Sequence, residues 1–532
     1  MFVSYEFIAF ICLLFIVYYL VPKKIQWILL LLANFGFYFC ADFRYPFFIL
    51  FTSATIYATA RFIAKEDEKA EAYAAAVKTM ENPPSREERR TYKKKVNARK
   101  KRMMLCGLLL NLAVLCVVKY TNFAIDNVNV LFGRMGREEL SYVDMIVPLG
   151  ISFYTFQAVG YLLDVYWGKC KAQKSFLKFT LFVSFFPQLI QGPISRYGDL
   201  YESLYKEHAF DGKQVRFGIE RILWGYFKKL VVADRMGVAV SMIMADPDYY
   251  TGAWVFVGML FYAAQLYGDF TGGIDITIGI AQTLGIHVEE NFIRPFFSKN
   301  IAEYWRRWHI SMGTWFRDYV FYPVSISNPQ KKLTQWTKAH IGMGAAKRIA
   351  VYFSTILTWL ATGIWHGASW HYVVWGLTNG VVILLSQECT PLYAKFHKKF
   401  PKLEHSALYQ GFQVLRTFLL LCCIRLFDNY ANVRLTFRQF FHMFTRFDVK
   451  QLKPQEFLDL GLNRWDYGIA VLGIILMFMV SLAGRSGSVR KKIAKKPYIL
   501  RYLLWMALFF VTLLLGKYGV GFDARQFIYN QF

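Results

Sequence analysis

Apolar runs of bilayer-crossing length recur along the whole chain, and they restrict its fold more than any other feature. A spanning helix needs about 20 mostly apolar residues. Because lipid offers backbone groups no hydrogen-bond partner, a chain built from such runs folds as a bundle of helices. We therefore predict a single all-α, polytopic integral membrane domain over residues 1–532, with about 10 to 12 transmembrane helices and no internal repeat.

The apolar runs give more candidate spans than that, because several runs are short or polar. The candidates are 4–21, 25–41, 45–63, 103–119, 146–166, 176–192, 216–232, 252–268, 270–286, 349–365, 371–386, 412–427, 467–484 and 499–516. The stretch 290–325 is too polar to span, which indicates a re-entrant or interfacial helix. We expect the first run to be a retained span, since a basic start and a small-residue cleavage site are missing.

The net charge of +27 accompanies a composition of 55% hydrophobic residues. Basic residues lie mainly between apolar runs, which favours contact with anionic membrane lipid over binding of nucleic acid. The segment 64–102 carries 13 Lys or Arg and is predicted to be cytoplasmic, with two solvated helices broken at Pro83-Pro84. Three spans precede it, so the N-terminus would be outside. The eight cysteines form no CxxC pair, which predicts neither a disulfide framework nor a metal site.

Polar residues inside apolar sequence are functional candidates, because lipid makes them costly. The first group follows a 3-4-3-4-3 spacing that predicts one helical face: Trp305, Trp308, Met312, Trp315, Tyr319 and Tyr322. His309 lies at the edge of this face, and Arg306 and Arg307 lie off it. The segment is either an interfacial anchor with a hydrogen-bonded histidine, or a site whose arginines, with Trp305, bind an anionic part of a substrate.

A second candidate is His366, which ends an apolar run between Trp365 and Gly367. A histidine kept neutral by desolvation can take a proton from a hydroxyl group. The alternative is a structural histidine bonded to a neighbouring helix. Trp365 would line the same site.

Two further groups contain carboxylates and amides. Asp269 and Asp275 flank Gly272-Gly273, which suggests a helix break or close packing. The two carboxylates could serve a substrate site, or could pair with arginine to hold helices together. Gln188 and Gln191 lie in a run interrupted by prolines, where they could bind substrate or support helix packing.

Together these stretches resemble the membrane-bound O-acyltransferase family, and within it the bacterial alginate O-acetyltransferase branch. The stretches that carry the resemblance are VPLGISFYTFQAVGYLLDVY (147–166), FFPQLIQGPISRY (185–197), GYFKKLVVAD (225–234), YGDFTGGIDITIGIAQTLGI (267–286), NFIRPFFSKNIAEYWRRWHISMGTWFRDYVFYP (291–323), TGIWHGASWHYVVWG (362–376) and FIYNQF (527–532). The RRWHIS and WHG blocks, in this order, are the most specific part.

The resemblance implies a ring of transmembrane helices around a central funnel in a bacterial cell membrane, with residues 140–380 as the catalytic core. It implies that His366 and His309 are the catalytic residues. An acyl group, acetyl in this branch, would pass from a cytoplasmic thioester donor, acetyl-CoA or an acylated carrier protein, to an exported polysaccharide. A separate extracytoplasmic acetyltransferase or esterase-like partner would complete the transfer, and no bound cofactor or metal is expected.

Two alternatives remain at this stage. A D-alanyl transferase for teichoic acid shares both histidine blocks and would take its acyl group from a carrier protein. A transporter or polymer-export channel also has many spans and a polar interior, although it predicts paired broken helices in the two halves of the chain.

Overall fold

The computed structural model describes residues 3–518, and every regular element in that range is a helix, which confirms the all-α prediction. The closing FIYNQF (527–532) lies outside the described residues. The chain divides into two compact units. One comprises Cys12–Asp211 and Leu284–Glu289, and the other comprises the residues up to Ile11, Gly212–Thr283 and the chain from Glu290 onward.

Seven helical segments of the described range are long and apolar enough to cross a membrane, which confirms a polytopic membrane protein. They are Lys23–Ala41, Tyr45–Thr79, Arg86–Arg134, Met343–His366, Ala407–Asn429, Arg464–Ser486 and Tyr498–Leu515. Two shorter apolar helices are Tyr5–Leu20 and Phe176–Leu189. The number is smaller than the predicted 10 to 12, because some predicted spans are broken or carry buried charges. The predicted spans 252–268 and 270–286 are instead one 31-residue helix.

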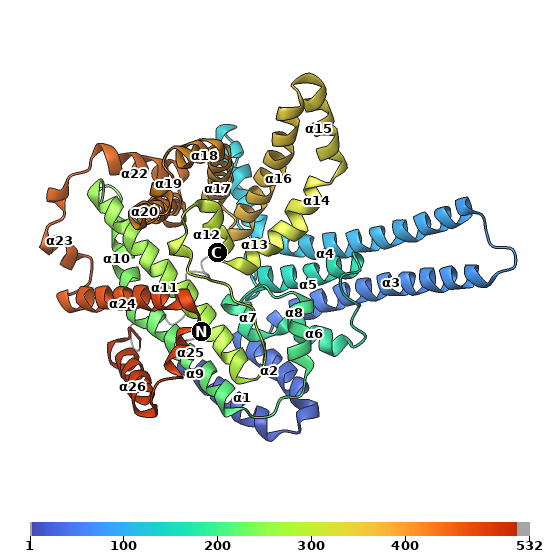
Figure 1. Ribbon diagram of the computed structural model, residues 1–532, viewed down its shortest axis with the longest axis horizontal. Coiled ribbons are helices and arrows are strands. Elements are labelled where there is room, and N and C mark those ends of the chain that lie inside the picture. The colour runs from blue at the N-terminus through green and yellow to red at the C-terminus, as the bar shows by residue number, and fades with distance from the viewer. Residues whose placement is uncertain (1–2, 519–532) are drawn as a thin grey trace. The chain divides into compact units, whose positions relative to one another are not determined.

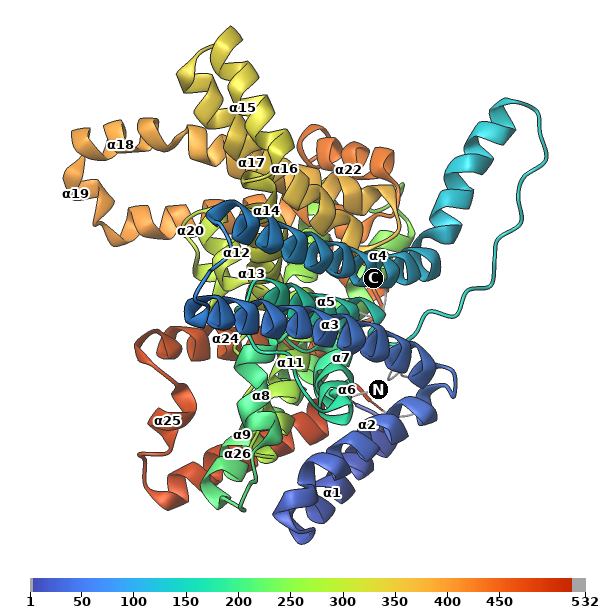
Figure 2. The same ribbon diagram turned by 90° about the vertical axis from the view of Figure 1, so that its right-hand side faces the viewer.

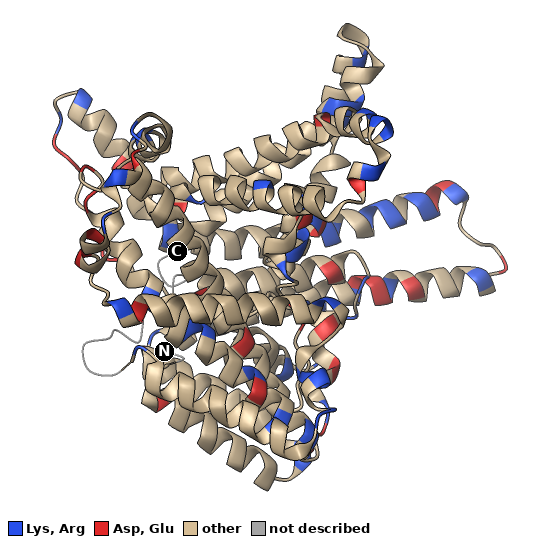
Figure 3. Cartoon of the chain, turned by 60° about the vertical axis from the view of Figure 1, so that its left-hand side comes forward, with Lys and Arg blue, Asp and Glu red and all other residues tan. Residues whose placement is uncertain are grey.

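The first unit holds the N-terminal helices. They are α1 (Tyr5–Leu20, which begins in the other unit), α2 (Gln26–Ala41), α3 (Tyr45–Thr79), α4 (Arg86–Arg134), α5 (Ile151–Tyr166), α6 (Phe176–Ser184), α7 (Phe186–Gln191) and α8 (Tyr197–Tyr205). α3 and α4 form a long antiparallel hairpin whose outer half carries the charges predicted for 64–102 (Figures 1 and 3). The two helices are separated at Pro83-Pro84, as predicted. Ser85 and Glu88 then form a capping box that satisfies backbone donors at the start of α4.

The break between α6 and α7 is stabilised by one buried amide. Asn34 of α2 accepts a hydrogen bond from the backbone N–H of Phe186 (3.2 Å) and donates one to Ser184 Oγ (3.1 Å). A broken apolar helix leaves backbone groups without helical partners, and burying them unsatisfied would be costly. Asn34 therefore allows the chain to turn at this point inside the unit.

The second unit contains the remaining helices. They are α9 (Gly212–Tyr226), the π-helical η2 (Phe227–Ala233), α10 (Asp234–Ala245), α11 (Ala253–Thr283), α12 (Ile301–Arg307), α13 (Ile310–Phe316), the π-helical η4 (Arg317–Phe321), α14 (Tyr322–Ser325), α15 (Asn328–His340), α16 (Met343–His366), α17 (Trp370–Glu388), α18 (Thr390–Lys399), α19 (Pro401–Glu404), α20 (Ala407–Ile424), α21 (Leu426–Asn429), α22 (Val433–Thr445), α23 (Pro454–Asp459), α24 (Arg464–Ala483), α25 (Val489–Ile493) and α26 (Tyr498–Leu515). Short 3₁₀ turns lie at Lys23–Ile25 in the first unit and at Pro295–Phe297, Val449–Gln451 and Gly484–Ser486 in the second unit.

Glycines bring α9 and α11 into backbone contact. A Cβ atom on Gly225 would lie 2.6 Å from the carbonyl oxygen of Gly272, and one on Gly218 would lie 2.8 Å from that of Gly279. No side chain fits at such a crossing, so only glycine lets the helices approach this closely. The glycine pair in α11 thus serves close packing, and the helix does not break there.

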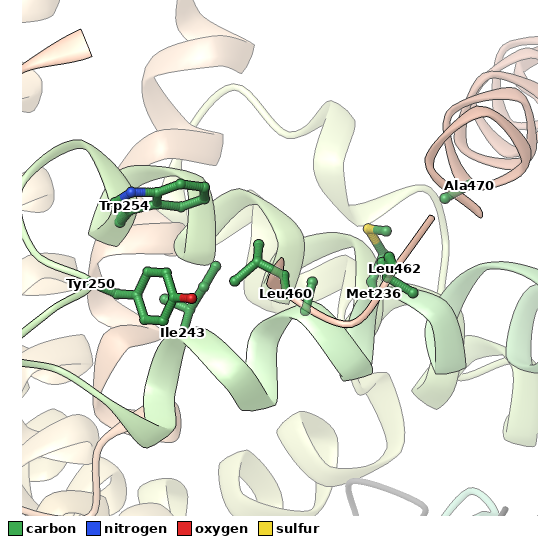
Figure 4. Close-up of a cluster of buried hydrophobic side chains, with 8 residues drawn as sticks. Met236, Ile243, Tyr250, Trp254, Leu460, Leu462 and Ala470 are labelled. Atoms are coloured by element: carbon green, nitrogen blue, oxygen red, sulfur yellow. The ribbon is translucent and has the colours of Figure 1, made fainter. Parts of the chain in front are cut away.

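An apolar cluster joins α10 to the start of α24 (Figure 4). Its buried members are Met236, Ala239, Ile243, Tyr250, Trp254, Leu460, Leu462 and Ala470. Fully burying a large apolar side chain contributes roughly 1.5–3 kcal/mol. This cluster fixes the segments that flank α11, the helix that carries Asp269 and Asp275.

Candidate active site

Glycines at the crossing of α16 and α17 set the position of His366. The two helices lie side by side (Figures 1 and 2). A Cβ atom on Gly363 would lie 2.4 Å from the carbonyl oxygen of Tyr372, and one on Gly376 would lie 2.4 Å from that of Trp359. The backbones therefore touch just before α16 ends at His366.

The imidazole of His366 is enclosed by aromatic rings. Its centroid lies 4.7 Å from the ring of Trp375, 5.1 Å from that of Trp365 and 6.4 Å from that of Tyr372. A Cβ atom on Gly367 would clash with the Tyr372 ring, so the glycine of the WHG block makes room for this wall. His366 is 9% exposed. It is a buried imidazole at a helix end, which agrees with the position expected from the sequence.

His309 lies at a turn between two short helices, so the prediction of one continuous helical face over 305–322 is wrong. α12 ends at Arg307, His309 has a left-handed backbone (φ 48°), and α13 begins at Ile310. The physical reason is a pairing with the segment before α12. Trp308 forms an isolated antiparallel bridge with Phe292, and Ile310 N–H donates to the carbonyl oxygen of Asn291 at 3.0 Å.

The Asn291 side chain and the ring of Phe270 hold the His309 imidazole. Its Nδ1 lies 3.3 Å from Asn291 Nδ2 and 3.4 Å from Asn291 Oδ1, and its ring lies 5.0 Å from that of Phe270. Burial, together with the positive charge of Arg425, lowers the pKa of His309 to about 3. His309 is therefore a neutral imidazole near pH 7, and a neutral imidazole accepts a proton on one nitrogen and donates from the other.

Trp365 connects the two histidines. Its ring lies 6.1 Å from that of His309 and 5.1 Å from that of His366. The structure therefore brings together the two imidazoles that the sequence singled out, although they come from α16 and from the turn before α13. Their catalytic roles remain a prediction.

An arginine that the sequence did not single out packs against three indoles near this pair. The Arg425 guanidinium lies 5.2 Å from the ring of Trp308, 5.6 Å from that of Trp375 and 5.8 Å from that of Trp305. Its Nη1 pairs with Asp428 Oδ2 at 2.7 Å. The available signal was a pair of opposite charges, i and i+3, at the end of the apolar run 412–427, where charge is costly.

The carboxylates Asp269 and Asp275 form ion pairs with cations of the same unit, and a substrate role for either stays a prediction. Lys229 Nζ lies 2.6 Å from Asp269, and Lys228 Nζ lies 2.6 Å from Asp275. Arg221 Nε adds a second contact to Asp275 at 2.7 Å. The packing alternative left open by the sequence thus describes the observed geometry, in which cations of α9 and η2 pair with carboxylates of α11.

The two arginines of the RRWHIS block differ from one another. Arg307 Nη2 pairs with Glu303 at 2.6 Å, one turn earlier in α12, whereas Arg306 is exposed. Gln188 and Gln191 are buried in α7 of the N-terminal unit, where Gln188 Nε2 donates to Ser195 Oγ. No substrate role for these four residues is tested, and each stays a prediction.

Comparison with known proteins gives a consistent result. Residues 173–337 match the profile of the membrane-bound O-acyltransferase family. The chain is 33% identical to the probable alginate O-acetylase AlgI of Azotobacter vinelandii over 70% of this chain and 65% of that protein. It is 30% identical to the peptidoglycan O-acetyltransferase of Helicobacter pylori over 58% of this chain and 59% of that protein. It is 30% identical to the teichoic acid D-alanyltransferase of Bacillus subtilis over 52% of this chain and 68% of that protein.

The matched region spans only part of the alginate O-acetylase relatives. It covers 65%, 52% and 62% of the proteins from Azotobacter vinelandii, Pseudomonas syringae and Pseudomonas aeruginosa. The family match itself covers residues 173–337, a segment that contains His309 and ends before His366.

Proposed function

The chain belongs to the membrane-bound O-acyltransferase family, and from this premise we propose that it transfers an acyl group from a thioester to a hydroxyl group of an exported polysaccharide. The observation that carries the proposal is the shared contact of His309 and His366 with Trp365. A hydroxyl group must lose a proton to attack a thioester, and the developing oxyanion needs a donor. Two neighbouring imidazoles can supply both functions.

In the proposed reaction His366 is the general base. Its unprotonated nitrogen takes the proton of the acceptor hydroxyl as the oxygen attacks the thioester carbonyl. The tetrahedral oxyanion then collapses, the carbon–sulfur bond breaks, and the thiolate takes the proton back from the His366 imidazolium. His309 donates a hydrogen bond to the carbonyl oxygen as negative charge develops on it. Such general base catalysis typically contributes a factor of about 100 to 10,000.

The proposed acyl group is acetyl, and the proposed donor is acetyl-CoA or an acylated carrier protein on the cytoplasmic side. Four of the five relatives described above are named as O-acetylating proteins, three for alginate and one for peptidoglycan. The exposed guanidinium of Arg306 is a candidate contact for an anionic part of the donor. A separate extracytoplasmic acetyltransferase or esterase-like protein is the proposed partner in acylation of the polymer.

The test is His366→Ala in the cell that makes the chain, compared with the exposed His287→Ala. The measurement is the ester content of the surface polysaccharide, with membrane levels of each variant determined by immunoblot. We expect His366→Ala to lower the ester content at least 100-fold and His287→Ala to leave it unchanged. Normal ester content in His366→Ala at normal protein level would refute the proposed base.

A second candidate is transfer of D-alanine to teichoic acid. It is favoured by one specific observation, the 68% coverage of the Bacillus subtilis teichoic acid D-alanyltransferase. The same experiment separates the two, because the ester released by mild base is acetate in one case and D-alanine in the other. Mass spectrometry of the released acid therefore identifies the acyl group directly.

A further inference from the structure

Arg425 is a buried cation at the junction of α20 and α21, and no part of the proposed reaction uses it. It follows the last residue of α20, Ile424, and precedes Leu426, the first residue of α21. Its side chain is 12% exposed, and that of its partner Asp428 is 3% exposed. A charge taken out of water is retained only when its surroundings compensate for the lost hydration.

The compensation comes from one carboxylate, one phenol and three indoles. The guanidinium pairs with Asp428, and Nη2 donates a hydrogen bond to the Tyr304 hydroxyl at 3.4 Å. The indoles of Trp305, Trp308 and Trp375 lie around the cation within 5.8 Å of Cζ. Such cation–π contacts strengthen when water is excluded.

Two of these indoles are direct neighbours of the two histidines, one in sequence and one in space. Trp308 follows the last residue of α12 and precedes His309 in the chain, so its position fixes the start of the left-handed turn. Trp375 lies 4.7 Å from the His366 ring. Arg425 thus contacts an immediate neighbour of each imidazole, and it does so from the junction of α20 and α21.

We propose that Arg425, held by Asp428, is a positioning residue that clamps Trp308 and Trp375 and thereby fixes the mutual placement of His309 and His366. The inference rests on the proposed function for its catalytic consequence. Lysine would replace arginine only in part, because a single ammonium keeps the charge but lacks the planar face that stacks on indoles and the fork that reaches Asp428 and Tyr304 together.

The first test reads the position of the imidazoles without any acyl transfer. Diethyl pyrocarbonate modifies neutral histidine, and peptide mass spectrometry gives the modification rate of each residue in the full chain in detergent. We expect Arg425→Met to raise the rates at His309 and His366 at least threefold, and Arg425→Lys to raise them by a smaller factor. The exposed His287 should react at the same rate in every variant.

The matched control breaks a different buried ion pair of the same unit. Arg235 Nε lies 3.1 Å from Asp466 Oδ1, with side chains 5% and 9% exposed. Arg235→Met should leave the rates at His309 and His366 within 1.5-fold of the unmodified chain. If Arg425→Met leaves both rates unchanged, or if Arg235→Met raises them equally, the inference is overturned. If Arg425→Met does not fold, Asp428→Asn replaces it as the test variant, because it keeps the arginine but removes the charge that holds it.

The second test measures transfer from acetyl-CoA to a polysaccharide fragment in proteoliposomes. We expect Arg425→Met to lower kcat at least tenfold while KM for the donor stays within twofold, since positioning acts on the reacting groups and not on donor binding. Arg425→Lys should restore part of kcat. An unchanged kcat in Arg425→Met, together with an inactive His366→Ala, would overturn this inference but not the proposed function. Absence of transfer by the unmodified chain would instead reject the proposed function, and the modification rates would still decide the positioning role.

Discussion

The indole of Trp365 lies 6.1 Å from the imidazole of His309, although the two residues come from different helical segments. Trp365 also neighbours His366 in the chain and contacts its ring at 5.1 Å. A large rigid ring in contact with both imidazoles restricts the position of each. Aromatic packing therefore contributes to the placement of both histidines.

The buried neutral state of His309 predicts an acid sensitivity of stability. Its folded pKa is about 3, against an ordinary value of 6.5. Between these values the unfolded chain binds a proton that the folded chain does not, so this contribution to stability is complete above pH 6.5 and declines as the pH falls toward 3. The slope in that window is about 1.4 kcal/mol per pH unit.

We therefore expect the thermal midpoint of the unmodified chain to fall more steeply between pH 7 and pH 5 than that of His309→Gln. The measurement is loss of soluble protein on heating in detergent at a series of pH values. His287→Gln, an exposed substitution, should follow the unmodified chain. Equal slopes for His309→Gln and the unmodified chain would show that His309 is not buried in its neutral form.

The crossing of α16 and α17 predicts strong sensitivity to a single methyl group. A Cβ atom on Gly363 would lie 2.4 Å from the Tyr372 carbonyl oxygen, which is backbone and cannot rotate away. Gly363→Ala should separate the helices and destabilise the chain by at least about 1–3 kcal/mol, the usual cost of overpacking. Gly344 lies in the same helix, and a Cβ atom added there would have no atom within 4 Å. Gly344→Ala is therefore the matched control.

Thermal midpoints and ester content of the polysaccharide would both report on this pair of variants. Gly344→Ala should stay within about 1 kcal/mol of the unmodified chain, since alanine is the better helix former. A stable, fully active Gly363→Ala would mean that α16 and α17 do not cross at this glycine.

The sequence predicted the polytopic helical class and the two histidines for one physical reason. Lipid penalises unsatisfied polar groups, so His366 at the end of an apolar run and the polar block around His309 were visible without a structure. The hairpin break at Pro83-Pro84 was likewise readable, because proline removes a backbone donor and excludes the helical conformation before it.

Three features could not be derived in that way. The turn at His309 depends on pairing of Trp308 with Phe292, a contact that local periodicity does not contain. The continuity of α11 depends on α9 lying against its glycines, so Gly272-Gly273 could equally have marked a break. The role of Arg425 depends on the indoles of Trp308 and Trp375, and the nearby Asp428 reveals only one of its partners in the sequence.

The ion pairs between η2 and α11 predict that Asp275 supports folding and does not take part in transfer. Lys228 is 4% exposed and Asp275 is 16% exposed, and removing one partner of a buried pair typically costs about 3–5 kcal/mol. Lys228→Met should lower the thermal midpoint sharply, and the double variant Lys228→Met with Asp275→Asn should recover part of the loss. The exposed pair Arg438–Asp248, with side chains 46% and 82% exposed, gives the control.

In that control Asp248→Asn should cost less than about 1 kcal/mol. The rate of transfer per folded molecule should stay within threefold in Asp275→Asn. A 100-fold lower rate of transfer in Asp275→Asn at normal stability would instead support a substrate-site role for Asp275.

The two arginines of α12 predict different kinetic effects. Arg307 is paired with Glu303, whose other oxygen accepts a hydrogen bond from Lys299 N–H at 2.8 Å, so Arg307 also stabilises the start of its helix. Arg306 is exposed and available to an anion. If Arg306 binds the 3′-phosphate of the donor, Arg306→Ala should raise KM for acetyl-CoA about tenfold with kcat unchanged. One charged hydrogen bond contributes about 1.5–3 kcal/mol. Arg307→Ala should lower the thermal midpoint as well.

A change of donor isolates the contact. With acetyl-dephospho-CoA the unmodified chain should lose affinity, and Arg306→Ala should lose no more, so the ratio of their KM values should fall toward one. Lys338→Ala, an exposed basic residue of α15, should keep the unmodified KM for both donors. A tenfold ratio that persists with the dephosphorylated donor would mean that Arg306 binds a different group, because an interaction with an absent phosphate cannot discriminate between the two chains.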